Sequence, residues 1–429
     1  MNQRPKILIV SFHFAPSPLV GAKRFSFLTR EFTRQGFDVH VVTNEIRDTS
    51  HGREDKSLPL HGTVHRVADS TESFLRLREK GRGWRRLVNG VLRGLLSPVG
   101  FDYFWARAAT RKALQVARTF PAGEAGIVIA TSPPHAALIA GARIARRLGW
   151  PLVLDYRDPW SAFEWPEWHR GGISNWMGKH IEARLVRRSA ARVLNTPDMR
   201  EWFEETFPSA PVTRNFAIPN GFDAVPRQWE PPAEGPMQIV HAGDIYGSRS
   251  LVPLLQAIRN VSLRHPQRPI RLTNYGPLPP REMRKIEAAQ LGEFIEIRAR
   301  IPFADLFVEL QRAHLLLAVV SEHMTYSTPY KVYDYMAAGR PILALAPRDA
   351  ALHDLLAESG SGEGVEAHDV EAIESSLEKM LFGPPASNAT RIERFRWVNL
   401  AQQYRAVIDA VATPPEKAAV PAEATRARG

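Results

Sequence analysis

The 429-residue chain contains no cysteine. This absence excludes disulfides, thiolate metal ligands and cysteine nucleophiles, and it is typical of a protein in a reducing cytoplasm. The chain also lacks any apolar run near the roughly twenty residues that a membrane-spanning helix needs. Its first segment, MNQRPKILIVSFHF, has an apolar stretch of only strand length, Ile7–Phe12, which is too short for a signal peptide. We therefore expect a cytoplasmic protein that is soluble or peripheral on the inner face of the cytoplasmic membrane.

Positive charge is in excess. The chain has 56 Lys and Arg residues against 45 Asp and Glu residues, a formal net charge of +11. Such an excess indicates an anionic partner, whether nucleic acid, a lipid surface or a phosphorylated substrate. Because no basic stripe is interleaved with aromatic residues and no known reader motif occurs, nucleic acid is not the predicted partner. No HExxH or other compact ligand cluster occurs either, so no metal site is predicted.

One segment has the pattern of a basic amphipathic helix. In WRRLVNGVLRGLL, residues 84–96, apolar residues recur at helical spacing and arginines occupy other faces. Together with the cations from Arg76 onward, this pattern predicts that residues 76–96 bind an anionic membrane surface. The alternative is an ordinary surface helix whose apolar stripe packs on its own domain.

Strand and helix patterns alternate in two series. The first contains the strand patterns KILIVSF, DVHVVT, GIVIAT and PLVLDY, and the second MQIVHAG, IRLTNYG, LLLAVV and PILALA. This alternation predicts parallel βαβ units with both sheet faces covered. Because two full series exceed one hydrophobic core, we expect two similar α/β domains, with a single large domain as the alternative. The expected divisions are residues 1–222, 223–385, a C-terminal helix over 386–413 and a disordered tail over 414–429.

Two candidate site segments follow strands of the first series. Ligands of parallel α/β sheets bind beyond the carboxyl ends of the strands, which draws attention to the loops there. Gly21 in SFHFAPSPLVGAKR would let the backbone approach a ligand, although an ordinary βα turn explains it equally well. Arg157 and Asp158 in DYRDPWS leave an apolar strand, where charges are costly unless they are paired or used. Their alternative is an internal Arg–Asp pair.

Two further candidates lie in the second series. Gly243 loosens the turn in HAGDIYGSRSLVPLL, and Arg249 there would clamp a diphosphate at a helix N-terminus, unless it is a surface arginine. Lys331 stands in the first turn of the predicted helix YKVYDYMAAG, where a cation is unfavourable unless an anion neutralises it. Asp334 would accept hydrogen bonds from sugar hydroxyls. The alternative for the last two is an i, i+3 salt bridge.

Taken together, these motifs resemble the bacterial glycosyltransferase family four. The resemblance covers about residues 5–412 and rests on the order and spacing of four stretches. These are ILIVSFHFAPSPLVGAKRFSFLTREFTRQGFDVHVVT, IATSPPHAALIAGARIARRLGWPLVLDYRDPW, IPNGFD and YKVYDYMAAGRPILALA.

The resemblance implies the GT-B fold, which has two facing Rossmann-like domains with parallel sheets and a last helix that crosses back to the N-terminal domain. It implies transfer of a sugar, with retention, from a nucleoside-diphosphate sugar to a glycan or lipid-linked acceptor in bacterial surface or exopolysaccharide synthesis. The donor would lie against the C-terminal domain and the acceptor against the N-terminal one. No cofactor or metal is implied.

The resemblance also implies roles for single residues. Gly21 stands where the family's glycine loop approaches the donor phosphates or the acceptor. Arg249 would bind the diphosphate, and Lys331 the phosphates or the sugar. Gly243 in the same loop and Asn220 in IPNGFD would contact the substrate or nucleotide.

The family's motif of two glutamates separated by seven residues is only half matched. Asp334 takes the place of the second glutamate, which binds the ribose, and Tyr326 takes the place of the first. Arg157, with Asp158 beside it, stands at a strand end that often holds a histidine, and these two residues, together with Arg249 and Lys331, are the expected catalytic residues. These departures leave two alternatives open: a nucleotide-sugar epimerase or hydrolase on the same fold, and a non-catalytic scaffold of a polysaccharide assembly complex.

Overall fold

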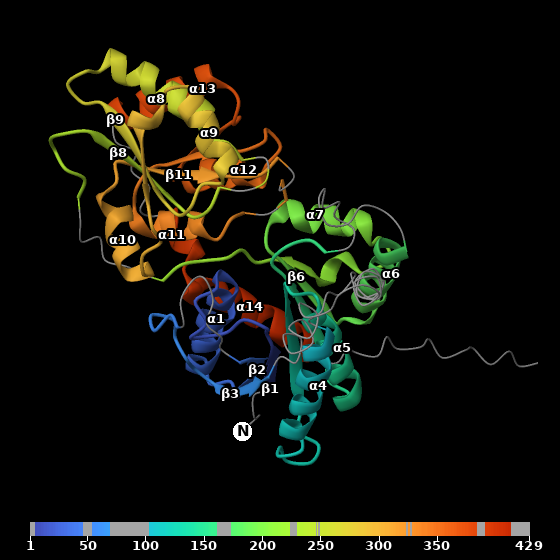
Figure 1. Cartoon of the computed structure of the whole chain (residues 1–429). Helices are drawn as coiled ribbons and strands as arrows, with labels where there is room; N and C mark the ends of the chain where they lie inside the picture. Colours follow the sequence, from blue (N-terminus) through green and yellow to red (C-terminus); the bar gives the residue numbers. More distant parts are fainter. Residues whose placement is uncertain are drawn as a thin grey trace, which may run out of the picture.

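The computed structural model contains two parallel sheets, one in each half of the chain (Figure 1). The described residues are 5–45, 54–68, 103–160, 173–223, 230–245, 247, 249–322, 325–326, 328–383 and 391–412. The first sheet has the order β3-β2-β1-β4-β5-β6-β7, made of β1 (Lys6–Val10), β2 (Val39–Asn44), β3 (Thr63–Val67), β4 (Gly126–Ser132), β5 (Leu152–Tyr156), β6 (Ala191–Leu194) and β7 (Asn215–Ala217). The second has the order β10-β9-β8-β11-β12-β13, made of β8 (Met237–Ala242), β9 (Ile270–Tyr275), β10 (Ile295–Arg298), β11 (Leu315–Val319), β12 (Ile342–Leu345) and β13 (Gly362–Val365).

Helices connect the parallel strands. Those of the first half are α1 (Lys23–Arg34), α4 (Tyr103–Ala117), α5 (Ala136–Leu148), α6 (Ile173–Arg188) and α7 (Pro197–Thr206). Those of the second half are α8 (Val252–Arg264), α9 (Pro280–Ala288), α10 (Phe303–Arg312), α11 (Lys331–Ala338), α12 (Ala351–Ser359) and α13 (Val370–Phe382), and α14 (Trp397–Ala412) ends the described chain.

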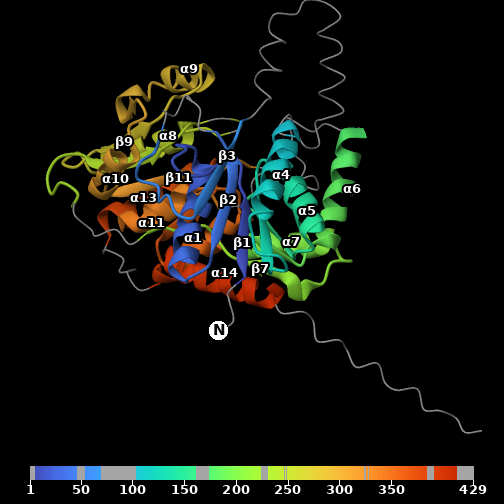
Figure 2. The same cartoon turned by 90° about the horizontal axis from the view of Figure 1, so that it is seen from below.

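The central strand β1 shows why the first sheet is buried on both faces. Its residues Ile7, Leu8, Ile9 and Val10 are fully buried. Since successive side chains of a strand point to opposite faces, Leu8 and Val10 join the core under α4 and α5, and Ile7 and Ile9 join the core under α1 and α14. Figure 2 shows β1 and β2 between α1 on one side and α4 and α5 on the other. A continuous apolar run is what a strand covered on both faces needs.

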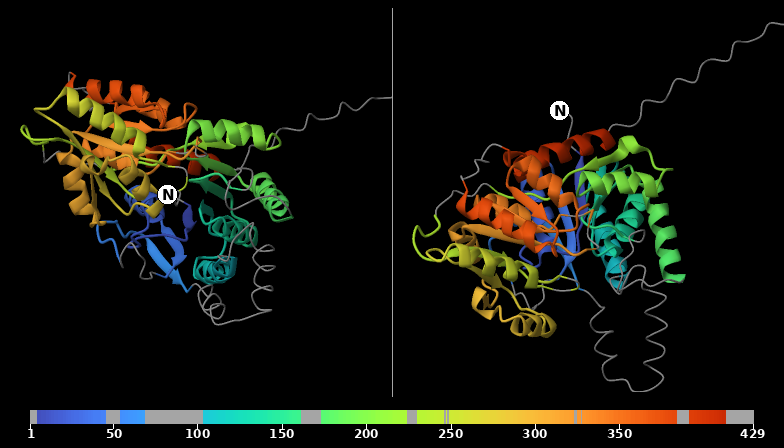
Figure 3. Two further views of the ribbon diagram at one scale, coloured as in Figure 1. Left: turned by 45° about the horizontal axis from the view of Figure 1, so that its top comes forward. Right: turned by 90° about the horizontal axis from the view of Figure 1, so that it is seen from above.

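The last helix returns to the first sheet. It follows Phe395, which belongs to a core of the second half, and it begins at Trp397. The ring of Tyr404 packs edge-on against Phe25 and Phe32 of α1, with centroids 6.2 and 5.5 Å away. Figure 3 shows this helix, in red, beside the blue N-terminal elements. The predicted crossover of the last helix is therefore confirmed, although the helix begins at Trp397, after a 3-10 turn over Glu393–Phe395, and not at residue 386.

The parallel α/β architecture predicted from the sequence is confirmed, with small shifts at element ends. The first helix begins as a 3-10 turn, Val20–Ala22, and becomes α1 at Lys23. The predicted division after residue 222 falls between β7 and β8. The predicted basic helix over residues 76–96 and the predicted tail over 414–429 lie outside the described residues. Among the helices that are described, none has the length and apolarity to cross a membrane.

Candidate active site

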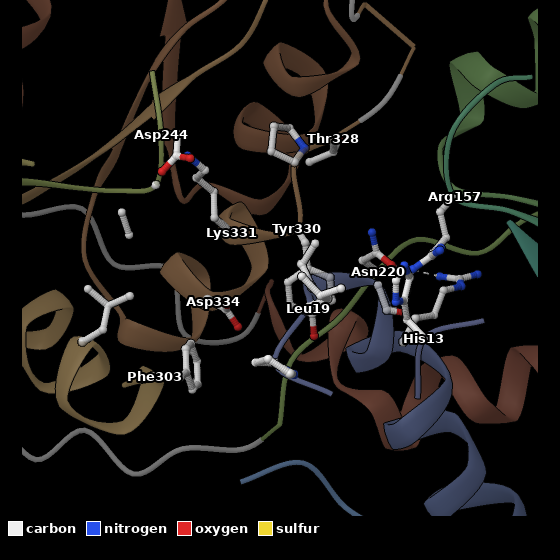
Figure 4. A pocket seen from close by; sticks show the side chains of 18 of the residues that line it. His13, Leu19, Arg157, Asn220, Asp244, Phe303, Thr328, Tyr330, Lys331 and Asp334 are labelled. Carbon is white, nitrogen blue, oxygen red and sulfur yellow. Dashed lines mark hydrogen bonds between the residues drawn. The ribbon is translucent and has the colours of Figure 1, made fainter. Parts of the chain in front are cut away.

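A cavity of about 870 Å³ lies between the two halves, at the carboxyl ends of their strands. Its walls come from the loops after β1, β4 and β5 on one side, and from the loops after β8 and β10 and the start of α11 on the other. Ligands of parallel sheets bind at this edge. All predicted site residues except Tyr326 line it, namely Gly21, Arg157, Asp158, Asn220, Gly243, Arg249, Lys331 and Asp334. Figure 4 shows the side chains of Lys331 and Asp244 on one side, and those of His13, Arg157 and Asn220 on the other.

Lys331 and Arg249 bring two cations to the second-half wall. Lys331 is the first residue of α11, and its Nζ lies 2.9 Å from Nε2 of His241. Burial and the nearby Arg249 guanidinium lower the pKa of Lys331 to about 7, although Asp244 acts in the opposite direction. Arg249 is itself buried. Two cations that repel each other in a shielded cavity, one of them at a helix N-terminus, favour a bound anion.

Gly243 makes room for the lysine. It has a φ of 131°, in the region that favours glycine, and a Cβ at this position would lie 3.0 Å from Nζ of Lys331. The next residue, Asp244, forms a salt bridge with Arg300 at the end of β10. The loop after β8 therefore shapes the wall around the Lys331 amine.

Asp334 pairs across the two halves and not with Lys331. Its Oδ2 accepts a hydrogen bond of 2.8 Å from Nζ of Lys23 in α1, and that Nζ lies 3.8 Å from the ring centroid of Phe303. Burial raises the pKa of Asp334, and Lys23 opposes the rise. Because Lys331 instead meets His241, the i, i+3 salt bridge is not the arrangement found. Asp334 lines the cavity, but one of its oxygens already has a partner.

Arg157 joins three loops of the first-half wall. Its Nε donates to the carbonyl of Ser132 at 3.0 Å and its Nη1 to that of Gly21 at 2.6 Å, and its Nη2 donates to the carbonyl of Pro133. A Cβ on Gly21 would lie 2.6 Å from Nη1 of Arg157 and 3.0 Å from Cδ2 of His13. A side chain at position 21 would therefore displace the Arg157 guanidinium. Arg157 organises the wall with three of its N–H groups.

The aspartates of DYRDPWS have separate environments. Asp155 is fully buried and forms a salt bridge with Arg24 at 2.9 Å, while Thr131 and Tyr404 donate to it at 2.9 and 3.3 Å. The internal pair considered for this segment thus involves Asp155 and Arg24, not Arg157. Asp158 lines the cavity, where burial raises its pKa and the Arg157 charge opposes the rise.

Asn220 lies at the junction of the two halves. Its backbone N–H donates to Oδ1 of Asn195 at 3.1 Å, and its own Oδ1 lies 3.4 Å from Nη1 of Arg24. The predicted segment IPNGFD therefore reaches the cavity from the end of the first sheet.

The structure does not bring Tyr326 to the predicted site. Its ring packs against Trp202 of α7, with centroids 5.6 Å apart, and its carbonyl accepts a hydrogen bond of 2.5 Å from Oγ1 of Thr196. Since an aromatic ring gains more from this apolar contact than from the polar cavity, its position differs from that predicted for a substrate ligand.

Two residues that line or adjoin the cavity were missed in the sequence. His13 follows β1 and lines the cavity, and burial together with the Arg157 charge lowers its pKa to about 4, so its ring is neutral. The rule that directed attention to loops after parallel strands applies to His13 as well as to Gly21. Lys23, the first residue of α1, was not among the predicted site residues. Its partner lies 311 residues away in the chain, and no local pattern indicates such a pair.

Comparisons with known proteins agree with this arrangement. Residues 21–221 match the family model of the glycosyl transferase 4-like domain. The chain is similar to the sucrose-phosphate synthase from Thermosynechococcus elongatus, with a TM-score of 0.58 and 15% identity over 96% of this chain and 95% of that one. It is also similar to a UDP-forming α,α-trehalose-phosphate synthase from Burkholderia xenovorans, with a TM-score of 0.61 and 14% identity over 96% of this chain and 100% of that one. A third similar structure is the lipopolysaccharide outer core galactosyltransferase WaaB in its apo form, with a TM-score of 0.58 and 13% identity over 94% of this chain and 99% of that one. No curated protein matches the chain in sequence.

The structural similarities span nearly the full length of both chains, so they include both sheets. The family model covers most of the first half. The chain therefore has the GT-B fold, as its resemblance to glycosyltransferase family four implies, and its residues 21–221 match the glycosyl transferase 4-like family model.

Proposed function

We propose that the protein is a retaining glycosyltransferase that moves a sugar from a nucleoside-diphosphate sugar to a glycan or lipid-linked acceptor. The observation that carries this proposal is the meeting of Lys331 and Arg249 on one wall of the cavity between the two sheets. A diphosphate that bound between these two cations would bring negative charge to this wall. The similar trehalose-phosphate synthase is a UDP-forming protein, which makes UDP the first nucleotide to test.

The proposed chemistry is a front-side displacement without a metal. As the bond between the sugar and the diphosphate breaks, negative charge grows on the leaving phosphate, and Lys331 and Arg249 stabilise it. Electrostatic stabilisation of this kind is usually the largest contribution to catalysis, and removal of one such group costs about a hundredfold in rate or more. Closure of the two halves would align the acceptor and exclude water that hydrolyses the donor.

The acceptor would bind at the first-half wall. There His13 offers a neutral ring, Asp158 a carboxyl group and Pro133 an apolar surface beside Arg157. A neutral histidine and a carboxylate are suited to hydrogen bonds with sugar hydroxyls. This wall therefore fits an uncharged glycan portion of the acceptor.

A lipid-linked acceptor would require contact with a membrane, and the surface of the first half supports that proposal. Helices α4, α5 and α6 lie side by side (Figure 2). Their only acidic residue, Glu182, is buried. Their exposed cations are Arg107, Arg111, Arg146, Arg147, Lys179, Arg184, Arg187 and Arg188, and the exposed Arg118 directly follows α4. Such a surface attracts anionic lipids.

Membrane binding is tested by cosedimentation with vesicles that contain anionic lipid. We expect binding that weakens with salt and is reduced in an Arg184→Glu and Arg187→Glu double variant. Leu92→Asp with Leu95→Asp tests the predicted helix over residues 76–96 separately. If the protein sedimented with neutral vesicles and not with vesicles that contain anionic lipid, an electrostatic membrane contact would be contradicted.

Activity is tested in two steps. Thermal-shift screening of UDP-, GDP- and ADP-sugars identifies the donor, and a labelled donor then reveals the product. Transfer of label to an acceptor supports the proposal, whereas an epimerised or free sugar identifies the epimerase or hydrolase alternative. Nucleotide binding without turnover on any glycan or lipid acceptor would favour the scaffold.

A further inference from the structure

Behind Lys331 lie two polar side chains that do not line the cavity. His241 in β8 and Asn274 in β9 are fully buried and are paired directly across the two strands. A buried polar group costs free energy unless it is hydrogen-bonded, and both residues are bonded into one chain that ends at the Lys331 amine. The proposed mechanism has so far given neither residue a role.

The direction of this hydrogen-bond chain is fixed at its far end. Nδ2 of Asn274 lies 2.7 Å from the carbonyl of Gly276 and must be the donor, because a carbonyl only accepts. Oδ1 of Asn274 therefore faces Nδ1 of His241, at 2.6 Å, and accepts a hydrogen bond from its N–H group. In a neutral imidazole the other nitrogen is then an acceptor. Burial and the charges of Lys331 and Arg249 lower the pKa of His241 well below its usual value, so the ring is neutral.

Nε2 of His241 therefore accepts a hydrogen bond from Nζ of Lys331, at 2.9 Å. This bond favours the charged amine and fixes its position, leaving its remaining N–H groups free to point into the cavity. We propose that His241 and Asn274 are positioning residues that hold Lys331 as a charged hydrogen-bond donor toward the leaving diphosphate and set the pH range in which the nucleotide binds. The inference rests on the proposed function.

Other charged groups near Lys331 act on it from several elements. Arg249 opposes its charge, and Asp244, itself paired with Arg300, favours it. Asp334 in the same helix is neutralised by Lys23 of α1. In contrast to these groups, His241 accepts a hydrogen bond from Nζ of Lys331 and belongs to a hydrogen-bond chain that continues through Asn274 to the backbone.

The first test is calorimetric titration of the full chain with UDP from pH 6 to pH 9. Wild-type affinity should fall as the pH rises through about 7, since the ligand-free amine then loses its proton. At pH 8, UDP is fully ionised, because a terminal phosphate has a second pKa of about 6. Binding at pH 8 should therefore take up close to one proton, measured as a difference between buffers of unlike ionisation enthalpy.

Three variants separate positioning from structural support. His241→Phe removes the hydrogen-bond acceptor of Lys331, and Asn274→Leu removes the contact that fixes the tautomer of the His241 ring. Both variants should therefore lower the pH midpoint of UDP binding by about one unit or more. His241→Gln retains an acceptor at a similar reach and should restore the wild-type midpoint. Midpoints that stay at the wild-type value in both His241→Phe and Asn274→Leu would overturn the proposal.

A second measurement does not depend on nucleotide binding. Only a neutral amine reacts with acetic anhydride, so the labelling rate of Lys331 in the ligand-free protein against pH reports its pKa. The exposed Lys285 of α9 is the internal control. A midpoint that is lower in His241→Phe than in wild type supports the positioning role even if UDP fails to bind, which would count against the proposed function alone. An unchanged labelling midpoint in a variant that remains folded by circular dichroism overturns the positioning role.

Discussion

Replacing Lys331 with methionine should have two opposite effects, which together test the proposed site. Methionine keeps most of the aliphatic stem and removes the charge. The cavity then loses a cation that binds the diphosphate, so affinity for UDP should fall. The ligand-free protein also loses a charge whose burial is unfavourable, so its stability should rise. If Lys331 were retained for stability, the variant would instead be less stable and would keep its affinity for UDP.

The size of each effect follows from the surroundings of Lys331. A hydrogen bond to a charged group contributes about 1.5–3 kcal/mol, which corresponds to an affinity loss of roughly 10- to 150-fold. The pKa of Lys331 is lowered from 10.5 to about 7. At pH 6 this shift corresponds to at most about 5 kcal/mol of lost stability. Leaving Nε2 of His241 without its donor costs about 1–3 kcal/mol, so the expected net gain is on the order of 2 kcal/mol.

Calorimetry with UDP at pH 6 and urea unfolding at the same pH measure the two effects. Lys285→Met is the matched control, because Lys285 is half exposed on α9 and does not line the cavity. It should change neither quantity by more than about 0.5 kcal/mol. Unchanged UDP affinity together with a loss of stability in Lys331→Met would refute the assignment of Lys331 to the diphosphate.

Three other predictions follow from the same contacts. The stability difference between wild type and Lys331→Met should shrink by about 1.4 kcal/mol per pH unit as the pH rises from about 7 toward 10.5, because in this range only the unfolded chain keeps the lysine proton. A difference in urea unfolding that stays constant over this pH range would contradict the prediction. Gly21→Ala should lower turnover at least tenfold by displacing Arg157. Gly292→Ala is the control and should leave turnover unchanged, because a Cβ there meets no atom within 4 Å; equal turnover in the two variants would contradict the packing argument. Asp155→Asn should lower the free energy of unfolding by about 3–5 kcal/mol, because it removes the negative charge that is paired with the buried Arg24. A change below 1 kcal/mol would contradict this prediction.

The parallel sheets were predictable because their signal is local. A strand covered on both faces is a continuous apolar run such as Ile7–Val10, and the helices between such runs have their own period. The same rule that places ligands at the ends of parallel strands predicted Gly21, Arg157 and Lys331 in one cavity.

The pairing of charged side chains could not be predicted from local sequence. Asp334 was weighed against a partner three residues away, whereas its partner Lys23 comes from the other half of the chain. Arg157 was given a catalytic role, but three of its N–H groups donate to backbone carbonyls in two other loops, those after β1 and β4. The role of Tyr326 was inferred from its register in a motif, and its ring instead packs on α7. Each of these outcomes depends on contacts between distant segments.

A crystal structure of the protein with UDP is the most direct test of the central claim that the cavity binds a nucleoside diphosphate. We predict phosphate oxygens within about 3 Å of both the Lys331 amine and the Arg249 guanidinium, with the nucleoside against the second half. UDP bound elsewhere on the protein, or in the cavity with its diphosphate contacting neither cation, would contradict the account.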